Sequence, residues 1–279
     1  MKTTLNLNGT LLDISTPRIM GILNVTPDSF YSKSRTQSVE EVLERANKMI
    51  TEGATFLDIG GYSTRPGAQD IPVQVELNRV LPVIEALSKH FPACFLSIDT
   101  FRAEVAQQAV QAGACMVNDV SGGNIDVAMF ETVANLCVPY VLMHSRGTPA
   151  TMSQLTDYEN LTLDIIDELQ AKVHQLRLLG VKDIIIDPGL GFAKNREQNF
   201  QLLNQLDALQ IFGLPLLVGV SRKSMIWKTL GIKPEDALNG TTVLNTIALM
   251  KGANLLRVHD VKEATECIKL SAPFIQSWS

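Results

Sequence analysis

The stretches FLDIGG at 56–61, CFLSIDT at 94–100 and DIIIDPG at 183–189 decide the fold of this chain. Each is a short apolar run that ends in polar residues or glycine, and five more runs share this form: IMGIL (19–23), MVNDV (116–120), YVLMH (140–144), LLVGVS (216–221) and LLRVHD (255–260). Runs such as 184–186 show no alternation of apolar and polar residues, which is typical of strands buried on both faces of a parallel sheet. The sequence therefore predicts eight buried parallel strands.

Amphipathic segments separate these runs. Apolar residues recur at helical spacing over 39–50, behind a predicted capping box from Ser38 to Glu41. Similar stripes occupy 106–110 and 165–176, and each of the three segments is followed by a glycine, a common helix stop. The chain is thus predicted to repeat a strand–helix unit.

Polar side chains follow nearly every predicted strand, which decides between an open sheet and a closed barrel. These residues are Asn24, Ser63 to Arg65, Asp99, Asn118, Asp119, His144, Asp187, Ser221 to Lys223, and Arg257 to His259. An open sheet brings strand ends together only near its switch point, whereas a barrel gathers all eight at one rim. We therefore predict an α/β fold, a single-domain (β/α)8 TIM barrel over 1–279, with residues 1–17 as a short N-terminal cover over the barrel bottom.

Bulk composition excludes several classes of protein. The 279 residues fit one barrel domain, and the formal net charge of -5 opposes non-specific nucleic-acid binding. The N-terminus lacks the apolar segment of a signal peptide, and no run reaches the about 18 apolar residues of a membrane span. The four cysteines show no zinc-site spacing and are expected to be reduced core thiols. We expect a cytoplasmic protein with no nucleic-acid or membrane partner.

Cations gather after the last two predicted strands. Arg222, Lys223, Arg257 and His259 stand at the usual phosphate-binding position of such barrels. Lysine and arginine in a water-poor cleft can stabilise phosphate charge and a departing diphosphate. Solvated surface cations, or partners in salt bridges, are the alternative interpretation.

Two carboxylates follow runs that are too apolar to leave a charge unpaired. Asp99 and Asp187 therefore need a partner or a ligand, because an isolated buried charge is costly. Together with the Asn118 amide they suit a flat heterocycle that offers N–H donors and ring acceptors. Capping of the following helices is the alternative role for each aspartate.

Seven motifs at these strand ends carry a family resemblance. They are MGILNVTPDSF (20–30), STRPGA (63–68), SIDT (97–100), NDVSGG (118–123), DPGLGFAK (187–194), SRKS (221–224) and RVHDV (257–261). In this order, across nearly the whole chain, they resemble the motifs of dihydropteroate synthases in the pterin-binding enzyme family. The resemblance implies condensation of 6-hydroxymethyl-7,8-dihydropterin diphosphate with p-aminobenzoate, giving 7,8-dihydropteroate and diphosphate. It also implies a homodimer and a target of sulfonamides.

The resemblance further implies roles for individual residues. Those implied to hold the pterin are Asp99, Asn118, Met143, Asp187 and Lys223. Those implied to bind the diphosphate are Asn24, Arg257 and His259, with Asn24 acting partly through Mg²⁺ as a metal ligand. The p-aminobenzoate site would comprise Phe30, Thr64, Arg65, Pro66, Phe192, Lys223 and Ser224. Asp99, Asp187, Lys223 and Arg257 would carry the catalysis.

Two departures from the family pattern and three rival functions remain open. YSKSR at 31–35 stands where many members read SDGG, and Tyr62 stands where they commonly have glutamate. A pterin-dependent methyltransferase could share the barrel and the pterin-holding residues, but it would need no p-aminobenzoate site. A non-catalytic pterin-binding paralogue and an unrelated phosphate-binding aldolase or isomerase barrel are the other two. His144 is expected to have mainly a packing role.

Overall fold

Eight parallel strands form one sheet in the computed structural model, which describes residues 3–25, 35–63 and 70–275. The strands are β3 (Arg18–Asn24), β4 (Phe56–Gly60), β5 (Phe95–Asp99), β6 (Met116–Asp119), β7 (Tyr140–Met143), β8 (Ile184–Asp187), β9 (Leu217–Val218) and β10 (Leu255–Val258). Their order is β8-β7-β6-β5-β4-β3-β10-β9, and a parallel bridge from Ile186 to Leu216 joins the two outer strands. The sheet is therefore closed, and the predicted barrel and all eight predicted strands are confirmed.

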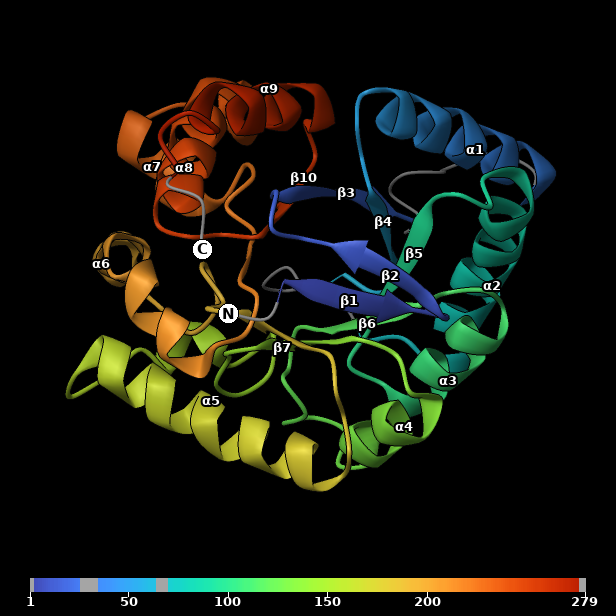
Figure 1. Cartoon of the computed structure of the whole chain (residues 1–279), viewed down its shortest axis with the longest axis horizontal. Helices are drawn as coiled ribbons and strands as arrows, with labels where there is room; N and C mark the ends of the chain where they lie inside the picture. The colour runs from blue at the N-terminus through green and yellow to red at the C-terminus, as the bar shows by residue number, and fades with distance from the viewer. Residues whose placement is uncertain (1–2, 26–34, 64–69, 276–279) are drawn as a thin grey trace.

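A ring of helices covers the outside of the barrel (Figure 1). These helices are α1 (Arg35–Thr51), α2 (Val73–His90), α3 (Ala103–Gln111), α4 (Met129–Leu136), α5 (Leu161–Leu178), α6 (Arg196–Asn204), α7 (Ser224–Leu230), α8 (Leu238–Met250) and α9 (Val261–Ser271). Short 3-10 segments lie at Met152–Gln154, Leu206–Phe212 and Pro234–Asp236. None of the described helices is long and apolar enough to cross a membrane.

The start of α1 differs from the prediction. The helix already includes Arg35, so Ser38 lies inside it and the predicted capping box from Ser38 to Glu41 is wrong. Apolar periodicity begins only at Val39, whereas the helical backbone begins one turn earlier, at Arg35.

An N-terminal hairpin closes the bottom of the barrel. Strands β1 (Thr4–Leu7) and β2 (Thr10–Asp13) pair antiparallel around Asn8 and Gly9, whose positive φ angles of 50° and 88° suit a two-residue hairpin turn. The hairpin lies across the middle of the helix ring in Figure 1. Its buried Leu5 and Leu7, with Ile14, join one apolar cluster with inward-facing strand residues. The predicted N-terminal cover is confirmed.

Side chains that face the barrel interior change from apolar to polar along β4, β6, β8 and β10. The lower layer includes Phe56, Met116, Ile185 and Leu255 in the cluster beneath the hairpin. Because side chains alternate between faces along a strand, the residue two positions later faces the same interior. Those upper positions are Asp58, Asn118, Asp187 and Arg257. Inward-facing polar side chains therefore lie at the carboxyl end of the barrel, above an apolar layer at its base.

The cysteines are all free thiols, as expected, but not all lie in the core. Cys115 and Cys267 are buried and Cys94 is partly buried, whereas Cys137 is exposed. Cys137 follows the last residue of α4 as its C-cap, with a left-handed φ of 54°. The prediction of a core thiol is therefore wrong at this position.

Candidate active site

The predicted pterin-binding residues lie on neighbouring strands at the carboxyl-terminal rim. Asp99 of β5 is in register with Asn118 of β6, and Met143 of β7 is in register with Asp187 of β8. On the other side Gly60 of β4 pairs with Asp99 and also with Asn24 of β3. The barrel therefore brings together residues that are far apart in the sequence.

A partly buried guanidinium, that of Arg257, links three strands at this rim. Arg257 donates from Nε to Asp58 Oδ2 and from Nη2 to Asp99 Oδ2, each at 2.6 Å. Burial opposes its charge, but the two carboxylates outweigh that effect and raise the pKa of Arg257. Burial raises the pKa of Asp99 to about 7 although Arg257 acts to lower it. The cluster therefore holds one cation between two carboxylates, one of which titrates near neutral pH.

Asp58 is the residue that sequence reasoning missed. Its side chain is fully buried, it accepts a second hydrogen bond from Asn118 Nδ2 at 2.9 Å, and its Oδ1 has no partner among the described residues. The signal was present, because a carboxylate two residues after Phe56 on an otherwise apolar strand must face the barrel interior. Asp58 lies in the middle of its strand, whereas the predicted site residues lie in the last two positions of a strand or after it.

Asp187, Lys223 and Phe192 form a second group at the rim. The Gly189 N–H donates to Asp187 Oδ1 at 2.7 Å, and burial raises the pKa of this aspartate while Lys223 opposes the rise. Burial lowers the pKa of Lys223 to about 8. The Lys223 ammonium donates to the Leu190 carbonyl and lies 4.9 Å from the centroid of the Phe192 ring. A cation and an aromatic ring thus stand side by side next to the carboxylate.

Two glycines keep the interior of the rim open. A Cβ atom added to Gly60 would lie 3.4 Å from Asn24 Oδ1 and 3.6 Å from Asp99 Oδ2. A Cβ added to Gly219 would lie 3.7 Å from Arg257 Cβ and 3.9 Å from Lys223 Nζ. Absence of side chains at these two positions leaves room for a flat group between the charged residues.

The remaining rim cations differ in their surroundings. Arg222 makes a bidentate pair with Asp260, with Nε to Oδ2 at 3.0 Å and Nη2 to Oδ1 at 2.5 Å. The salt-bridge interpretation therefore applies to Arg222. His259 lies 3.0 Å through Nδ1 from Ser221 Oγ, which also accepts from the His259 backbone N–H at 3.2 Å. That contact orients the ring at the end of β10.

The other predicted site residues are placed only in part. Met143 is buried with Phe101 and Val120, and Phe192 packs against this small apolar cluster. Ser224 is exposed at the first position of α7, directly after Lys223. Four predicted p-aminobenzoate residues lie outside the described residues: Phe30, Thr64, Arg65 and Pro66. The YSKSR departure lies there too, except for Arg35.

Tyr62, the second departure, lies in an aromatic and cationic contact. Its ring meets Phe101 edge-on at 4.9 Å, and the Arg102 guanidinium is 5.2 Å from the ring centroid. Arg102 also donates to Glu76 Oε2 at 2.9 Å. The tyrosine is therefore held against Phe101 and Arg102, just after the end of β5.

A buried network supports the loop after β8. Lys194 Nζ lies 2.9 Å from His144 Nδ1 and donates to the carbonyls of Gly189 at 3.1 Å and Phe192 at 3.0 Å. An ammonium only donates, so His144 is neutral and its Nε2 donates to Glu168 at 3.1 Å. Burial accordingly lowers the pKa of His144 to about 4. His144 is buried, and it is held by these hydrogen bonds rather than by packing alone.

Known proteins resemble this chain over almost its whole length. A family model described as pterin binding enzyme matches residues 20–259. The dihydropteroate synthase of Escherichia coli (strain K12) is 40% identical over 94% of this chain and 93% of its own length. That of Synechocystis is 45% identical over 91% of this chain and 88% of its own length.

Solved structures give the same result. Dihydropteroate synthase from Yersinia pestis, solved with a sulfonamide drug complex, has a TM-score of 0.91 and 41% identity, covering 97% of this chain and 98% of that chain. The Xanthomonas albilineans enzyme, solved with 4-aminobenzoic acid, has a TM-score of 0.91 and 38% identity, covering 99% of both chains.

We predict that His144 makes the protein sensitive to acid. Between its ordinary pKa of 6.5 and its folded pKa of about 4, the unfolded chain binds a proton that the folded chain does not, so stability falls as pH falls through that window. His144→Gln keeps a donor and an acceptor but cannot titrate. From pH 7 to 4.5, urea unfolding should show native protein losing roughly 2 to 3 kcal/mol more than His144→Gln. Equal losses would contradict this assignment.

Proposed function

The chain belongs to the pterin-binding enzyme family, and we propose that its barrel rim binds a dihydropterin diphosphate and p-aminobenzoate in adjoining pockets. The activity is that of a dihydropteroate synthase, a transferase of folate biosynthesis. The observation that carries the assignment of the pockets is the meeting of Asp99, Asn118, Asp187 and Lys223 around an opening that glycines keep free. This arrangement favours the synthase over an aldolase or isomerase barrel, because it offers acceptors to a flat heterocycle.

The pterin would lie among the buried carboxylates and the amide. Asp187 and Asn118 present oxygen acceptors, and Lys223 supplies a donor beside them. Such a set complements the N–H donors and the carbonyl of a pterin edge. Burial strengthens each of these bonds, because little water competes for the same groups.

The diphosphate would lie at the cationic side of the rim. Arg257 and His259 come from one strand end and its extension, so both reach the same position. Asn24 and Asp99 present oxygen atoms across Gly60, and oxygen donors suit Mg²⁺, which is often held by one or two protein groups together with substrate phosphates. When bound, Mg²⁺ would add positive charge beside the diphosphate oxygens. The residues present therefore fit this ion.

The p-aminobenzoate pocket would adjoin the pterin site. Phe192 gives it an apolar face, and Ser224 stands exposed at the start of α7, where it can donate to a carboxylate. Lys223 would serve both pockets because it lies beside Asp187 and beside Phe192. The same site makes the enzyme a target of sulfonamides, with which the Yersinia pestis relative was solved.

The reaction proposed is a dissociative substitution at carbon. The bond from the methylene carbon to the diphosphate oxygen breaks, and the electron-rich pterin spreads the positive charge that develops. Asp99 and Asp187 stabilise that charge, while Arg257 and His259 stabilise the departing diphosphate. The amine nitrogen then attacks the carbon and releases a proton to solvent. The chain itself contributes positioning and electrostatics rather than a nucleophile.

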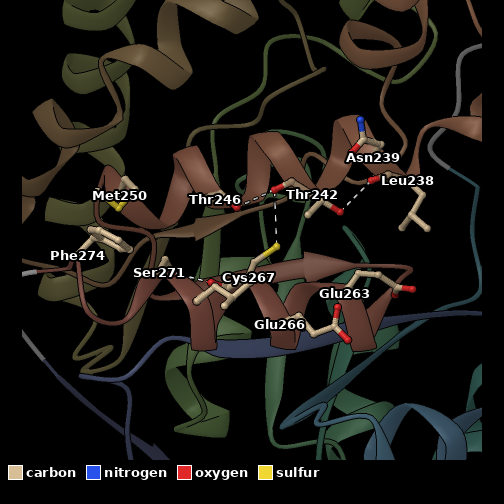
Figure 2. Close-up of a pocket in the computed structure, with 11 residues that line it drawn as sticks. Leu238, Asn239, Thr242, Thr246, Met250, Glu263, Glu266, Cys267, Ser271 and Phe274 are labelled. Carbon is tan, nitrogen blue, oxygen red and sulfur yellow. Dashed lines mark hydrogen bonds between the residues drawn. The ribbon is translucent and has the colours of Figure 1, made fainter.

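We also propose a homodimer built on α8 and α9. Figure 2 shows side chains of both helices around a pocket. Several apolar residues near it are exposed, including Leu270 at 75%, Phe274 at 70% and Met250 at 50%. An apolar patch of this kind commonly marks a protein–protein contact.

A cytoplasmic location is proposed as well. Free cysteines, one of them exposed, are usual in a reducing compartment. Fractionation of expressing cells, with the protein recovered outside the cytoplasmic fraction, would refute it.

The decisive assay measures diphosphate release from the dihydropterin diphosphate with and without p-aminobenzoate. We expect release that depends on the amine, with dihydropteroate identified by mass, and loss of most of the rate when EDTA removes Mg²⁺. Tight pterin binding without product would instead identify a non-catalytic pterin-binding protein.

The two-pocket assignment predicts different effects at neighbouring residues. Lys223→Ala should raise KM for both substrates by roughly ten-fold, because it removes a charged donor shared by the pockets. Ser224→Ala should raise KM mainly for p-aminobenzoate. Steady-state kinetics with each substrate varied in turn would measure both, and an equal rise of both KM values in Ser224→Ala would argue against the assignment.

The dimer proposal predicts that Phe274→Glu dissociates the protein, because a carboxylate cannot be buried there without a partner. Leu178→Glu is the matched control, since Leu178 on α5 is 74% exposed and far from this surface in sequence. Light scattering after gel filtration should give twice the chain mass for the native protein and the control. A native protein at the mass of a single chain would rule the dimer out.

A further inference from the structure

Asp58 lies inside the barrel, one layer below the rim that holds the proposed ligands. It is fully buried on β4, and its Oδ2 accepts from Arg257 Nε at 2.6 Å and from Asn118 Nδ2 at 2.9 Å. In the sheet order β6-β5-β4-β3-β10, these donors come from strands two places away on either side. One oxygen atom therefore ties together two rim residues from opposite sides of β4.

The contact with Asp58 fixes which way the Asn118 amide faces. The Asn118 nitrogen donates to Asp58 Oδ2, so it faces Asp58 and the amide oxygen is left on the other side. Within residues 3–25, 35–63 and 70–275, no group donates to that oxygen. Asn118 as a whole is 2% exposed, but this oxygen is not among the fully buried side-chain atoms that lack a partner, so it stays accessible to a ligand.

We propose that Asp58 is a positioning residue that sets the hydrogen-bond polarity of the pterin site. It commits the Asn118 oxygen to the ligand, which selects a heterocycle edge that donates an N–H, and it fixes the Arg257 guanidinium at the same time. This inference rests on the proposed function, because it assumes a dihydropterin as the ligand. Asp58 itself acts through Asn118 and Arg257 rather than on the reacting atoms.

Asp58→Asn removes this control with little change of shape. If the new amide oxygen keeps both bonds, its nitrogen takes the place of Oδ1, which has no partner, and buries unpaired N–H groups. If the amide turns over, its nitrogen faces two donors and Asn118 must turn as well. Either arrangement weakens the hold on the Asn118 oxygen.

The experiment is a double-mutant cycle on binding of 7,8-dihydropterin, measured by calorimetry. Asp58→Asn should weaken binding roughly ten-fold in the native chain. In an Asn118→Ala background the same substitution should weaken binding by at most about two-fold. In kinetics, KM for the dihydropterin diphosphate should rise while KM for p-aminobenzoate stays within about two-fold. Additive effects, or an equal rise of both KM values, would show a merely structural role and overturn the proposal.

Ser97→Ala is the matched control. Ser97 is in register with Asp58 on the neighbouring strand, is fully buried, and its hydroxyl makes no hydrogen bond with the described residues. We expect it to bind dihydropterin as the native chain does. A ten-fold loss in Ser97→Ala would mean that any change in this layer disturbs the site, which also overturns the proposal.

Asn118→Asp tests the same contact from the other side if Asp58→Asn does not fold. It keeps an oxygen for the ligand but sets two carboxylates against each other, so dihydropterin binding should fall more than ten-fold. Unchanged binding would refute the contact. If the native chain itself does not bind dihydropterin, the proposed function is wrong and this inference falls with it, whereas normal native binding with unaffected variants refutes the inference alone.

Discussion

The ion pairs of the partly buried Arg257 guanidinium are the interaction on which the rest of the site depends. The Arg257 side chain is 20% exposed and held between Asp58, which is fully buried, and Asp99, which is 11% exposed. Charges in such a place are tolerated only as partners, and removal of one partner from a buried pair typically costs about 3 to 5 kcal/mol. Removal of any one of the three residues is therefore expected to destabilise the positions of the other two. Because they come from β4, β5 and β10, they also tie the first strands of the barrel to the last.

The charged residues of the proposed site are already paired with one another before a ligand binds, and this pairing bears on the chemistry proposed for the site. Burial raises the pKa of Asp99 to about 7, the Arg257 cation acts to lower it, and the negative charge of Asp58 acts to raise it. A ligand that develops positive charge would offset the negative charge of these carboxylates, as the pterin does when diphosphate leaves. Lys223, whose pKa burial lowers to about 8, stands ready to donate without a large cost of ordering. In the proposed site the charged groups are therefore already in place before a ligand binds.

Sequence patterns predict the barrel well because burial and position coincide in it. Eight apolar runs had to be strands, and the polar residues after them had to meet at one rim. The same patterns missed Asp58, because attention to strand ends overlooks a charge within a strand, although Phe56, Asp58 and Gly60 share one face. They placed the start of α1 too late and Cys137 in the core, because both depend on backbone that bears no apolar period. The pairing of Arg222 with Asp260 depends on three-dimensional proximity and could not be read from spacing.

Apolar packing at the base of the barrel explains why the rim can carry many polar side chains and still be ordered. The apolar plug of hairpin and lower strand residues fixes the strands, and each polar residue then inherits its direction from the residue two positions earlier. After β8 the buried Lys194 donates to the carbonyls of Gly189 and Phe192. The loop between the two proposed pockets is therefore held at both of these residues. Added side chains could not be accommodated there, since a Cβ at Gly189 would lie 1.9 Å from the His144 carbonyl oxygen. Gly189 thus allows the close approach of the loop to the His144 backbone, and Lys194 satisfies the carbonyls of Gly189 and Phe192.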